Sequence, residues 1–392
     1  MSASKQTNKR VLVALSGGMD SAVAAALLKT QGYEVIGLHM QFWDKTKIAD
    51  IPPGGSCCRY VDPDKVAKVC AQLEISFQIM DAQEQFQNDV VDYMVHEYLM
   101  ARVPNPCCKC NSTVKFDALL KKADELHCDL VATGHYAKVV RNAEGSESTL
   151  LRAVDREKDQ TYYLFGLKQS QLARALMPLG DLLQSNVVKM AQTFGLPAEA
   201  KAAIQPICFV DNTGYREIVA ACAPERYRPG GPIVDREGAM VGRHLGLFNY
   251  RVGQRKVLGA DSPENSKKVV IGFDTRMNGL IVGDEPELYH STLVATDCNW
   301  IGGQDFSRGM KVKARIRAHH HEEAACILTL LNNNSVHVEF EKPQLAIMSG
   351  QAIVFYQEDI LVGGGWIDSL IPPVLSKLTK RQTFAVAADT KK

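Results

Sequence analysis

The sequence predicts an α/β protein with a helix-covered parallel sheet, followed by a small central domain and a C-terminal β-barrel. Strand-like and helical segments alternate up to about Cys208, which is typical of βαβ units. After Cys208 the chain becomes rich in glycine and in short strand-like pieces, and from about Leu288 onward short alternating strands predict the barrel. The expected organisation is a disordered lead-in at 1–10, an α/β domain at 11–212, a central domain at 213–285, a barrel at 286–376 and a flexible tail at 377–392.

Apolar periodicity and capping residues place the elements of the α/β domain. We expect strands at 11–15, 35–40, 75–80 and 129–133, and helices at 22–29, 62–73, 84–100 and 112–126. Asp62 is the expected N-cap of the second helix, with Pro63 in its first turn, and Ser112 or Thr113 is the expected cap of the last. In the barrel, 336–340 and 352–355 are expected strands.

Composition excludes several classes of protein. The chain has 392 residues, of which 46% are hydrophobic and 23% charged, as in ordinary globular proteins. A net charge of +1 excludes a globally basic nucleic-acid binder, so an RNA partner needs a local patch. No apolar run approaches the ~20 residues of a membrane span, and 1–10 lacks the apolar core of a secretory signal. Eleven cysteines without an export signal therefore indicate reduced thiols and a cytoplasmic protein.

The most informative segment is Ala14-Leu15-Ser16-Gly17-Gly18-Met19-Asp20-Ser21, between the first strand and an alanine-rich helix. Two glycines let backbone N–H groups approach a phosphate, and the positive end of the helix favours its charge. The segment lacks the G-x-x-x-x-G-K-[ST] pattern, so the kinase-like phosphate loop is not implied. We interpret it as an anion-binding loop in preference to a plain serine-capped turn.

Two groups of cysteines could carry chemistry. Asn105 to Asn111 is expected to be a loop between two helices, with Cys110 just before the second helix and beside Lys109. A helix start and an adjacent cation both favour a thiolate, although a lone C-x-x-C also fits structural zinc or a redox pair. Cys208 taken alone is more typical of a buried structural cysteine. Five more cysteines have apolar neighbours and are expected in the core: Cys70, Cys128, Cys222, Cys298 and Cys326.

A basic stripe is expected on one barrel strand. Four cations alternate with apolar residues between positions 311 and 318, namely Lys311, Lys313, Arg315 and Arg317. Period-two spacing puts the four on one face of the strand. This face is either a local phosphate-binding patch or an ordinary solvated surface.

These features together resemble the tRNA-specific 2-thiouridylases, the MnmA family of PP-loop ATP pyrophosphatases, over nearly the whole chain. The motifs that carry the resemblance are Ala14–Ser21, Gly37–Met40, Pro104-Asn105-Pro106, Cys110-Asn111, Thr133–Tyr136, Lys158–Gln160, Ile207–Phe209, Gly253–Lys256 and Val362–Gly365. The resemblance implies a pyrophosphatase domain, a central domain and a barrel. It also implies thiolation of a tRNA uridine at C2, at the wobble position, with ATP cleaved to AMP and pyrophosphate.

The resemblance also implies a role for each matching residue. Residues 14–21 would bind ATP with Met40 and Gly134, and Asp20 would lie near Mg²⁺. Cys110 would be the nucleophile and Cys208 the persulfide carrier, beside a target-base pocket of Asn105, Pro106 and Cys107. Contacts to tRNA would come from His135, Lys158, Asp159, Gln160, Arg315, Ile316 and Gln351.

Two departures from the family pattern leave alternatives open. Many members have Asp where this chain has Cys107, and Ile204-Gln205-Pro206 replaces an acidic motif. A thiol at 107 allows two versions of sulfur delivery: a Cys208 persulfide resolved by Cys110, or a [4Fe–4S] cluster held by Cys107, Cys110 and Cys208. Rival hypotheses are a PP-loop amidotransferase or ligase and a non-catalytic tRNA-binding protein. The expected partners are tRNA and a cysteine desulfurase or sulfur-relay protein, acting on a monomer.

Overall fold

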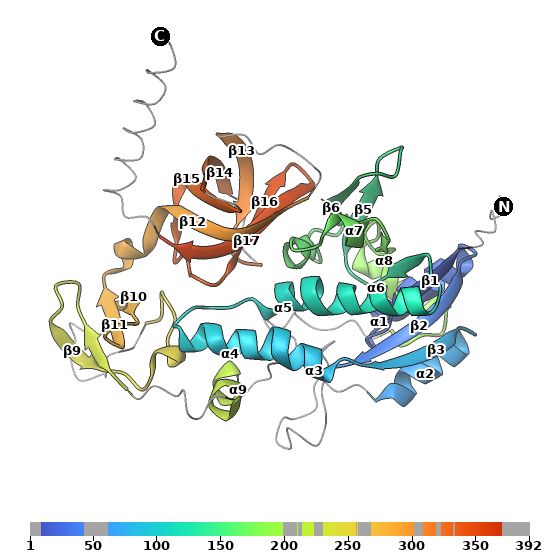
Figure 1. Cartoon of the computed structure of the whole chain (residues 1–392), viewed down its shortest axis with the longest axis horizontal. Helices are drawn as coiled ribbons and strands as arrows, with labels where there is room; N and C mark the ends of the chain where they lie inside the picture. The colour runs from blue at the N-terminus through green and yellow to red at the C-terminus, as the bar shows by residue number, and fades with distance from the viewer. Residues whose placement is uncertain are drawn as a thin grey trace, which may run out of the picture.

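The computed structural model (Figure 1) describes residues 9–42, 62–198, 210, 214–222, 230–255, 257, 268–301, 309–318, 323–331 and 334–370. The parallel sheet and a small mixed sheet lie at opposite ends of the molecule, and the barrel lies between them above the long helices (Figure 1). Cys208 and the Ile204–Pro206 departure lie outside the described residues, as do nearly all of the expected lead-in and the whole expected tail.

The first sheet is parallel throughout, in the order β3-β2-β1-β4-β7. Its strands are β1 (Arg10–Ala14), β2 (Glu34–Gln41), β3 (Ser76–Asp81), β4 (Leu130–Ala132) and β7 (Ala175–Leu176). The first four confirm the expected strands. β7 was not predicted, because two residues are too short to produce a periodic pattern.

Helices cover both faces of this sheet, as predicted. Successive residues of β1 point into two different cores: Leu12 packs in one, and Val11 and Val13 pack in the other. The Leu12 side carries α4 (Asp92–Leu99) and α6 (Phe116–Glu125). The opposite side carries α1 (Met19–Thr30), α2 (Pro63–Gln72) and α8 (Gln184–Thr193). α2 begins as expected, because the Asp62 carboxylate accepts a hydrogen bond from Asp64 N at 3.1 Å and Pro63 follows directly.

The segment that carries Cys107, Cys108 and Cys110 is helical, and the prediction of a loop was wrong. α5 (Pro106–Lys109), the π-helical turn η2 (Cys110–Lys115) and α6 follow one another without a break. Pro106 can open a helix because its φ is preset and a first-turn N–H would lack a partner in any case. Ser112 Oγ donates to the carbonyl of Cys108, one turn earlier, so it lies inside the helix and does not cap it.

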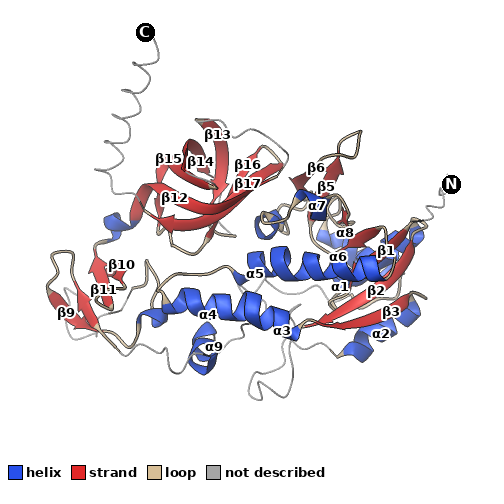
Figure 2. Ribbon diagram, viewed as in Figure 1, coloured by secondary structure: helices blue, strands red, loops and turns tan. Residues whose placement is uncertain are grey.

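The expected helix at 84–100 also contains a π-helical turn. It consists of α3 (Gln83–Phe86), η1 (Gln87–Val91) and α4, and η1 contacts η2. π-Helical turns occur frequently at functional sites, so these two contacting turns indicate a functional site near the helix that carries the cysteines. Figure 2 shows α3–α4 and α5–α6 as two long helical rods side by side.

The barrel is confirmed and is extended by a hairpin from the first domain. Its strands are β12 (Tyr289–Trp300), β13 (Met310–Arg315), β14 (Glu323–Leu331), β15 (Ser335–Leu345), β16 (Ala352–Gln357) and β17 (Ile360–Ser369), closed by β12–β17 pairing. The hairpin of β5 (Ala137–Arg141) and β6 (Ser148–Arg152) pairs with β17 through Leu150 and Leu151. It was not expected from the sequence, and it joins the two domains in one continuous sheet.

The central domain contains a four-stranded sheet in the order β10-β11-β8-β9, over a small apolar core. Its strands are β8 (Pro232–Val234), β9 (Met240–Arg243), β10 (Val269–Asp274) and β11 (Gly279–Gly283). The other short helices among the described residues are η3 (Thr161–Leu164), α7 (Gln169–Leu172), η4 (Leu247–Asn249) and η6 (Glu285–Leu288).

A helix, α9 (Tyr215–Cys222), stands at the start of a region where only strand-like pieces were predicted. Tyr215 stacks on Tyr98 of α4, with ring centroids 3.9 Å apart, so tertiary packing stabilises this helix. Cys222, expected in the core, is exposed at its last position.

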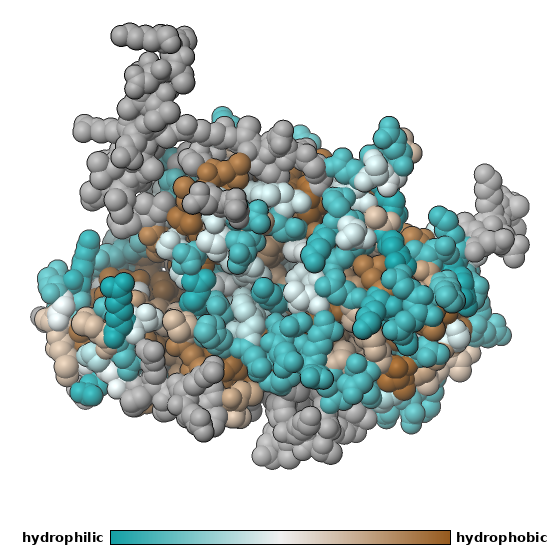
Figure 3. Space-filling view, viewed as in Figure 1, coloured by the Kyte–Doolittle hydropathy of each residue, from teal (hydrophilic) through white to brown (hydrophobic). Residues whose placement is uncertain are grey.

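The surface agrees with the composition. Hydrophilic side chains cover most of the face drawn in Figure 3, and apolar side chains form small separate patches. Across the described ranges, no helix combines the length and apolar character needed to span a bilayer.

Candidate functional site

The loop after β1 has the geometry expected of an anion-binding loop. Gly17 has a φ of +72°, and Gly18 precedes α1 without a side-chain cap. Ser21 holds the loop together, because its Oγ donates to Gly18 O at 3.0 Å and accepts from Ser16 N at 3.2 Å. Backbone N–H groups at the start of a twelve-residue helix therefore face the loop.

The other predicted ATP-binding residues lie at the same edge of the sheet. Met40 is buried near the carboxyl end of β2, and Leu15 N donates to Leu38 O on that strand. Gly134 follows β4 and packs directly on α1, since a Cβ there would lie 2.8 Å from Ser21 N and 2.9 Å from Asp20 C. The three segments predicted to bind ATP therefore come together at the carboxyl edge of the sheet, where open α/β sheets bind their ligands.

Asp20 is oriented by a buried tyrosine that the sequence analysis gave no role. Tyr136 Oη donates to Asp20 Oδ1 at 3.0 Å. Burial, followed by the charge of Asp20, raises the pKa of Tyr136 well above its ordinary value, so the phenol remains a donor in neutral and mildly alkaline solution. Nothing in the sequence except its place after β4 could have indicated this contact.

Tyr136→Phe is expected to weaken use of Mg·ATP about five- to tenfold, because one oriented hydrogen bond to a carboxylate is lost. The KM for ATP should rise in the variant. In the wild type, titration of Tyr136 should not change the KM for ATP between pH 7 and about 9.5, because the raised pKa of Tyr136 keeps its phenol protonated. Tyr289→Phe, at an exposed tyrosine of β12, is the control. An unchanged KM in Tyr136→Phe would contradict this role.

The cysteines of the α5–η2 helix have different environments. Cys107 and Cys110 are three residues apart and share a helix face; Cys107 is partly exposed and Cys110 is 2% exposed. Cys108 points into the core, where its thiol donates to Tyr162 O at 3.7 Å and burial raises its pKa. All three are reduced thiols. Convergence of Cys110 with Cys208 stays a prediction, because Cys208 lies outside the described residues.

The helix that carries Cys110 reaches the ATP edge through aromatic stacking. Phe116, at the junction of η2 and α6, stacks on His135 with ring centroids 6.3 Å apart. His135 directly follows Gly134, which packs on Asp20 and Ser21. Cys110 and Met40 also belong to the same hydrophobic core. The predicted nucleophile and the anion loop are thus parts of one packed unit.

The predicted base-pocket residues Asn105 and Pro106 are buried at the start of this helix. The chain that leads to them is fixed by the barrel: Gln351 Nε2 donates to Val103 O at 3.0 Å, and Val103 N donates to Ser349 O at 2.8 Å. Gln351, predicted to contact tRNA, therefore holds the entry to the cysteine helix in this structure. The role that the resemblance implies for it stays a prediction.

The cation beside Cys110 is held by two aromatic rings. Lys109 Nζ lies 5.5 Å from the centroid of Tyr93 on α4 and 5.7 Å from that of Trp366 on β17. The barrel thus contacts the cysteine helix through Trp366, and the chain before that helix through Gln351. Within the described residues no three His, Cys, Asp or Glu side chains converge as a metal site, and the cluster prediction also involves Cys208.

The predicted tRNA-contacting residues fall into two groups. Gln160 and His135 lie beside the ATP edge: Gln160 Oε1 accepts from Tyr136 N at 2.9 Å, and His135 Nδ1 lies 2.8 Å from Thr133 Oγ1. Asp159 forms an ion pair with Arg315, and the neighbouring Ile316 is buried. The strand alternation is confirmed within β13, where Lys311 and Lys313 are exposed, but β13 ends at Arg315 and Arg317 lies beyond it. Arg315, however, is turned into the contact between the domains.

Sequence profiles of three domain families match in chain order. They are the tRNA methyl transferase HUP domain at 9–212, the tRNA methyl transferase PRC-barrel domain at 221–284 and the aminomethyltransferase β-barrel domain at 290–367. The tRNA-specific 2-thiouridylase MnmA of Geotalea uraniireducens is 42% identical over 365 residues, covering 93% of this chain and 96% of the relative. The chain belongs to the MnmA family.

Other MnmA proteins are similarly close. Those of Geobacter metallireducens and Clostridium perfringens are 42% and 39% identical over 370 and 365 residues. The matches cover 93% of this chain in both cases, and 98% and 100% of the relatives. The resemblance drawn from the motifs is therefore confirmed, together with the fold class of a parallel α/β domain, a central domain and a barrel.

Proposed function

We propose that this MnmA-family protein thiolates C2 of a uridine in tRNA, at the wobble position, and cleaves ATP to AMP and pyrophosphate. One observation carries the proposal: the helix with Cys110 packs, through Phe116 and His135, on the loop that borders the anion-binding residues. Oxide is a poor leaving group from a uridine carbonyl. Adenylation of that oxygen makes AMP the leaving group, and sulfur can then take its place.

The residues of the α/β domain have distinct tasks in this reaction. The N–H groups of Gly17 and Gly18 and those at the start of α1 bind phosphate oxygens, while Ser16 N stays bonded to Ser21 Oγ. Asp20 would hold Mg²⁺, since an oriented carboxylate next to a phosphate loop is the hard oxygen ligand that this ion prefers. When bound, Mg²⁺ neutralises triphosphate charge. Asn105 and Pro106 would enclose a base that has left its stack, at a cost of a few kcal/mol that contacts to the tRNA backbone offset.

Sulfur delivery is proposed to use two thiols. A desulfurase or relay protein leaves a persulfide on Cys208, and its terminal sulfur attacks C2 and displaces AMP. The Cys110 thiolate then attacks the inner sulfur of Cys208, which forms a Cys110–Cys208 disulfide and leaves the second sulfur on C2. An external thiol reductant restores both cysteines. Reduced thiols at 107 and 110 suit this cycle and the reducing cytoplasm in which we place the protein.

The second version uses a [4Fe–4S] cluster, and the positions of the cysteines on the helix are compatible with it. Cys107 and Cys110 share one helix face and could ligate two irons, with Cys208 as third ligand and the fourth iron open for sulfide. We favour the persulfide version, because it requires only Cys110 and Cys208.

Cys107→Ser separates the two versions. A persulfide enzyme should keep activity within about tenfold, because this thiol takes part in no covalent step, whereas a cluster enzyme should lose iron and activity together. The measurements are 2-thiouridine formation and iron content after anaerobic purification. Cys222→Ser, at the exposed cysteine of α9, is the matched control. Iron in the wild type that is lost with Cys107 would reject the persulfide version.

Nucleoside analysis tests the whole proposal. Transfer RNA from cells that lack the protein should lose 2-thiouridine, and purified protein with ATP, tRNA and a sulfur donor should restore it. An amidotransferase or ligase would cleave ATP with ammonia and leave tRNA unthiolated, and a non-catalytic binder would release no AMP. The profile names also mention methyl transfer. Appearance of a methylated uridine without 2-thiouridine would therefore reject our proposal in favour of that chemistry.

A further inference from the structure

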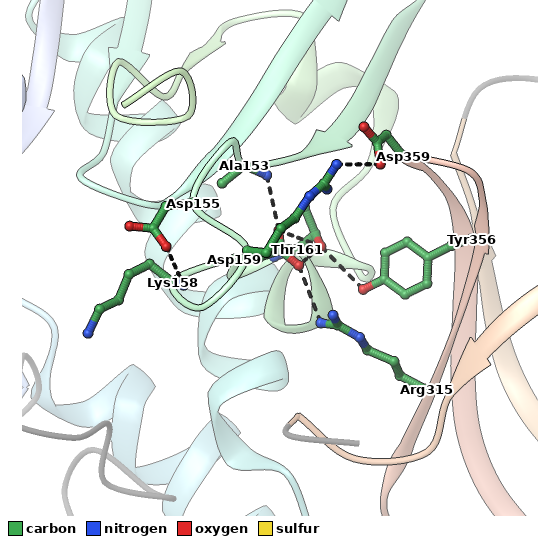
Figure 4. A network of polar contacts seen from close by, with 9 residues as sticks. Ala153, Asp155, Lys158, Asp159, Thr161, Arg315, Tyr356 and Asp359 are labelled. Atoms are coloured by element: carbon green, nitrogen blue, oxygen red, sulfur yellow. Dashed lines mark hydrogen bonds and ion pairs between the residues drawn. The ribbon is translucent and has the colours of Figure 1, made fainter. Parts of the chain in front are cut away.

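A buried polar network joins the α/β domain to the barrel (Figure 4). Its centre is Asp159, whose side chain is 0% exposed. The Asp159 carboxylate accepts hydrogen bonds from Ala153 N at 3.2 Å and from Thr161 Oγ1 at 2.9 and 3.0 Å. Arg315 of β13 completes it, with Nη1 3.3 Å from Oδ2. A carboxylate removed from water in this way depends on its donors and its cation.

Tyr356 of β16 packs behind this ion pair. It is fully buried, and its hydroxyl lies 3.2 Å from Thr161 Oγ1. The guanidinium groups of Arg152 and Arg315 lie 3.8 and 5.6 Å from its ring centroid. Burial first, and then the charge of Asp159, raise the pKa of Tyr356, so the ring stays neutral between the two cations. The two domains therefore share one network of charge and hydrogen bonds.

The network lies next to the strand pairing that joins the domains. Arg152 N donates to Asp359 O at 2.9 Å, where β6 meets β17, and Arg156 forms an ion pair with Asp359 at 2.6 Å. The strand register thus brings the loop at 153–161 opposite β13 and β16. The ion pair between Asp159 and Arg315 adds a side-chain contact between the domains to this strand pairing.

Other cations on these elements lie outside the network. Lys311 and Lys313 share the face of β13 with Arg315 but are exposed. Lys158 points away from the Asp159–Arg315 pair (Figure 4). Lys311 and Lys313 can contact a phosphate backbone directly, whereas Arg315 is 13% exposed and already faces a carboxylate.

We propose that Asp159 and Arg315 act as an interdomain positioning pair. They hold Lys158 of the α/β domain and Lys311 and Lys313 of the barrel at a fixed spacing for one RNA backbone, and do not themselves bind phosphate. This inference rests on the proposed tRNA substrate. It assigns to the pair a role different from the direct tRNA contacts that the family resemblance implies.

The salt dependence of tRNA binding separates the two roles. Each phosphate contact contributes about 0.7 to 0.9 to the slope of log K against log salt, so loss of a direct contact lowers the slope by nearly one. Lys313→Gln, on the same strand face, should lower the slope in this way. Arg315→Gln and Asp159→Asn should each weaken binding about tenfold at an unchanged slope, and the double variant should bind no more weakly than the poorer single variant. A lowered slope in Arg315→Gln, with effects that multiply in the double variant, would overturn the proposal.

Hydrogen exchange without RNA makes the inference independent of the activity. Arg315→Gln and Asp159→Asn should both speed exchange of backbone amides in 153–161 and in β13, while Lys313→Gln should change neither. Arg315→Lys keeps the cation and replaces Arg315→Gln in the test if the glutamine variant does not fold. Its exchange rates should lie between those of the wild type and Arg315→Gln. Faster exchange in the two variants, together with no tRNA thiolation by the wild type, would support the positioning role of the pair and reject the proposed function. Unchanged exchange in both variants would reject the pair whatever the activity.

Discussion

Cys110→Ser is expected to abolish 2-thiouridine formation, lowering the single-turnover rate by about 10³-fold or more, because a serine hydroxyl is not ionised at neutral pH. A serine can neither form a disulfide with Cys208 nor act as a thiolate ligand to iron, so both versions of sulfur delivery fail. The fold should persist. Cys110 lies inside a helix, where a serine hydroxyl can donate to a carbonyl one turn earlier and so limit the cost of its burial. The measurement is nucleoside analysis after one turnover with saturating ATP.

Cys108→Ser is the matched control on the same helix. Its thiol is fully buried and donates to Tyr162 O, a bond that a hydroxyl can keep. We expect activity within a few-fold of the wild type and a loss of stability of about 1 to 2 kcal/mol from burial of a more polar group. Retention of more than a tenth of the activity in Cys110→Ser would remove Cys110 from the mechanism.

Gly134→Ala is expected to lower ATP-dependent pyrophosphate release about 100-fold, because the new Cβ would meet backbone atoms that cannot move aside separately. It would lie 2.8 Å from Ser21 N and 2.9 Å from Asp20 C, so the loop after β4 must move away from α1. That movement displaces the first turn of α1, which we propose to bind phosphate, together with Asp20. The crowding should also lower the free energy of unfolding by about 1 to 3 kcal/mol. Pyrophosphate release, ATP affinity and thermal unfolding measure these effects.

Gly272→Ala is the control for this crowding. Gly272 lies on β10 of the central domain, and a Cβ there would meet no atom within 4 Å. Its stability should change by no more than about 0.5 kcal/mol and its ATP use not at all. Wild-type ATP affinity in Gly134→Ala would show that the contact between the β4 loop and α1 does not shape the nucleotide site.

The parts of the fold that were predicted from sequence have strong local signals. β1 and β2 are apolar runs of ordinary length, and Asp62-Pro63 contains both the cap and the first turn of α2. The 14–21 loop is one continuous segment, so its geometry follows from its own glycines and Ser21. The alternation in β13 is likewise a property of the strand itself.

The failures occurred where distant contacts outweigh local preference. Asn105 to Asn111 has the composition of a loop, yet Cys108 and Asn111 bond to carbonyls of Tyr162 and Tyr163, and this packing stabilises a helix. α9 is held by Tyr98, more than a hundred positions earlier in the chain. The β6 edge of the β5–β6 hairpin pairs with β17, which belongs to another domain. None of these partners lies within the window that a local pattern covers.

By itself, the sequence determined the chemistry available to this protein: an anion-binding loop, cysteines with a neighbouring cation, and cations on one strand face. Only the tertiary structure decided which of these groups meet. Arg315 lies on the cationic face, as its spacing requires, but it pairs with Asp159 because strand pairing brings β13 opposite the 153–161 loop. Gln351 bonds to the chain before the cysteine helix for a similar reason. Periodicity fixes the side of an element on which a residue lies, while the packing of domains fixes what that side contacts.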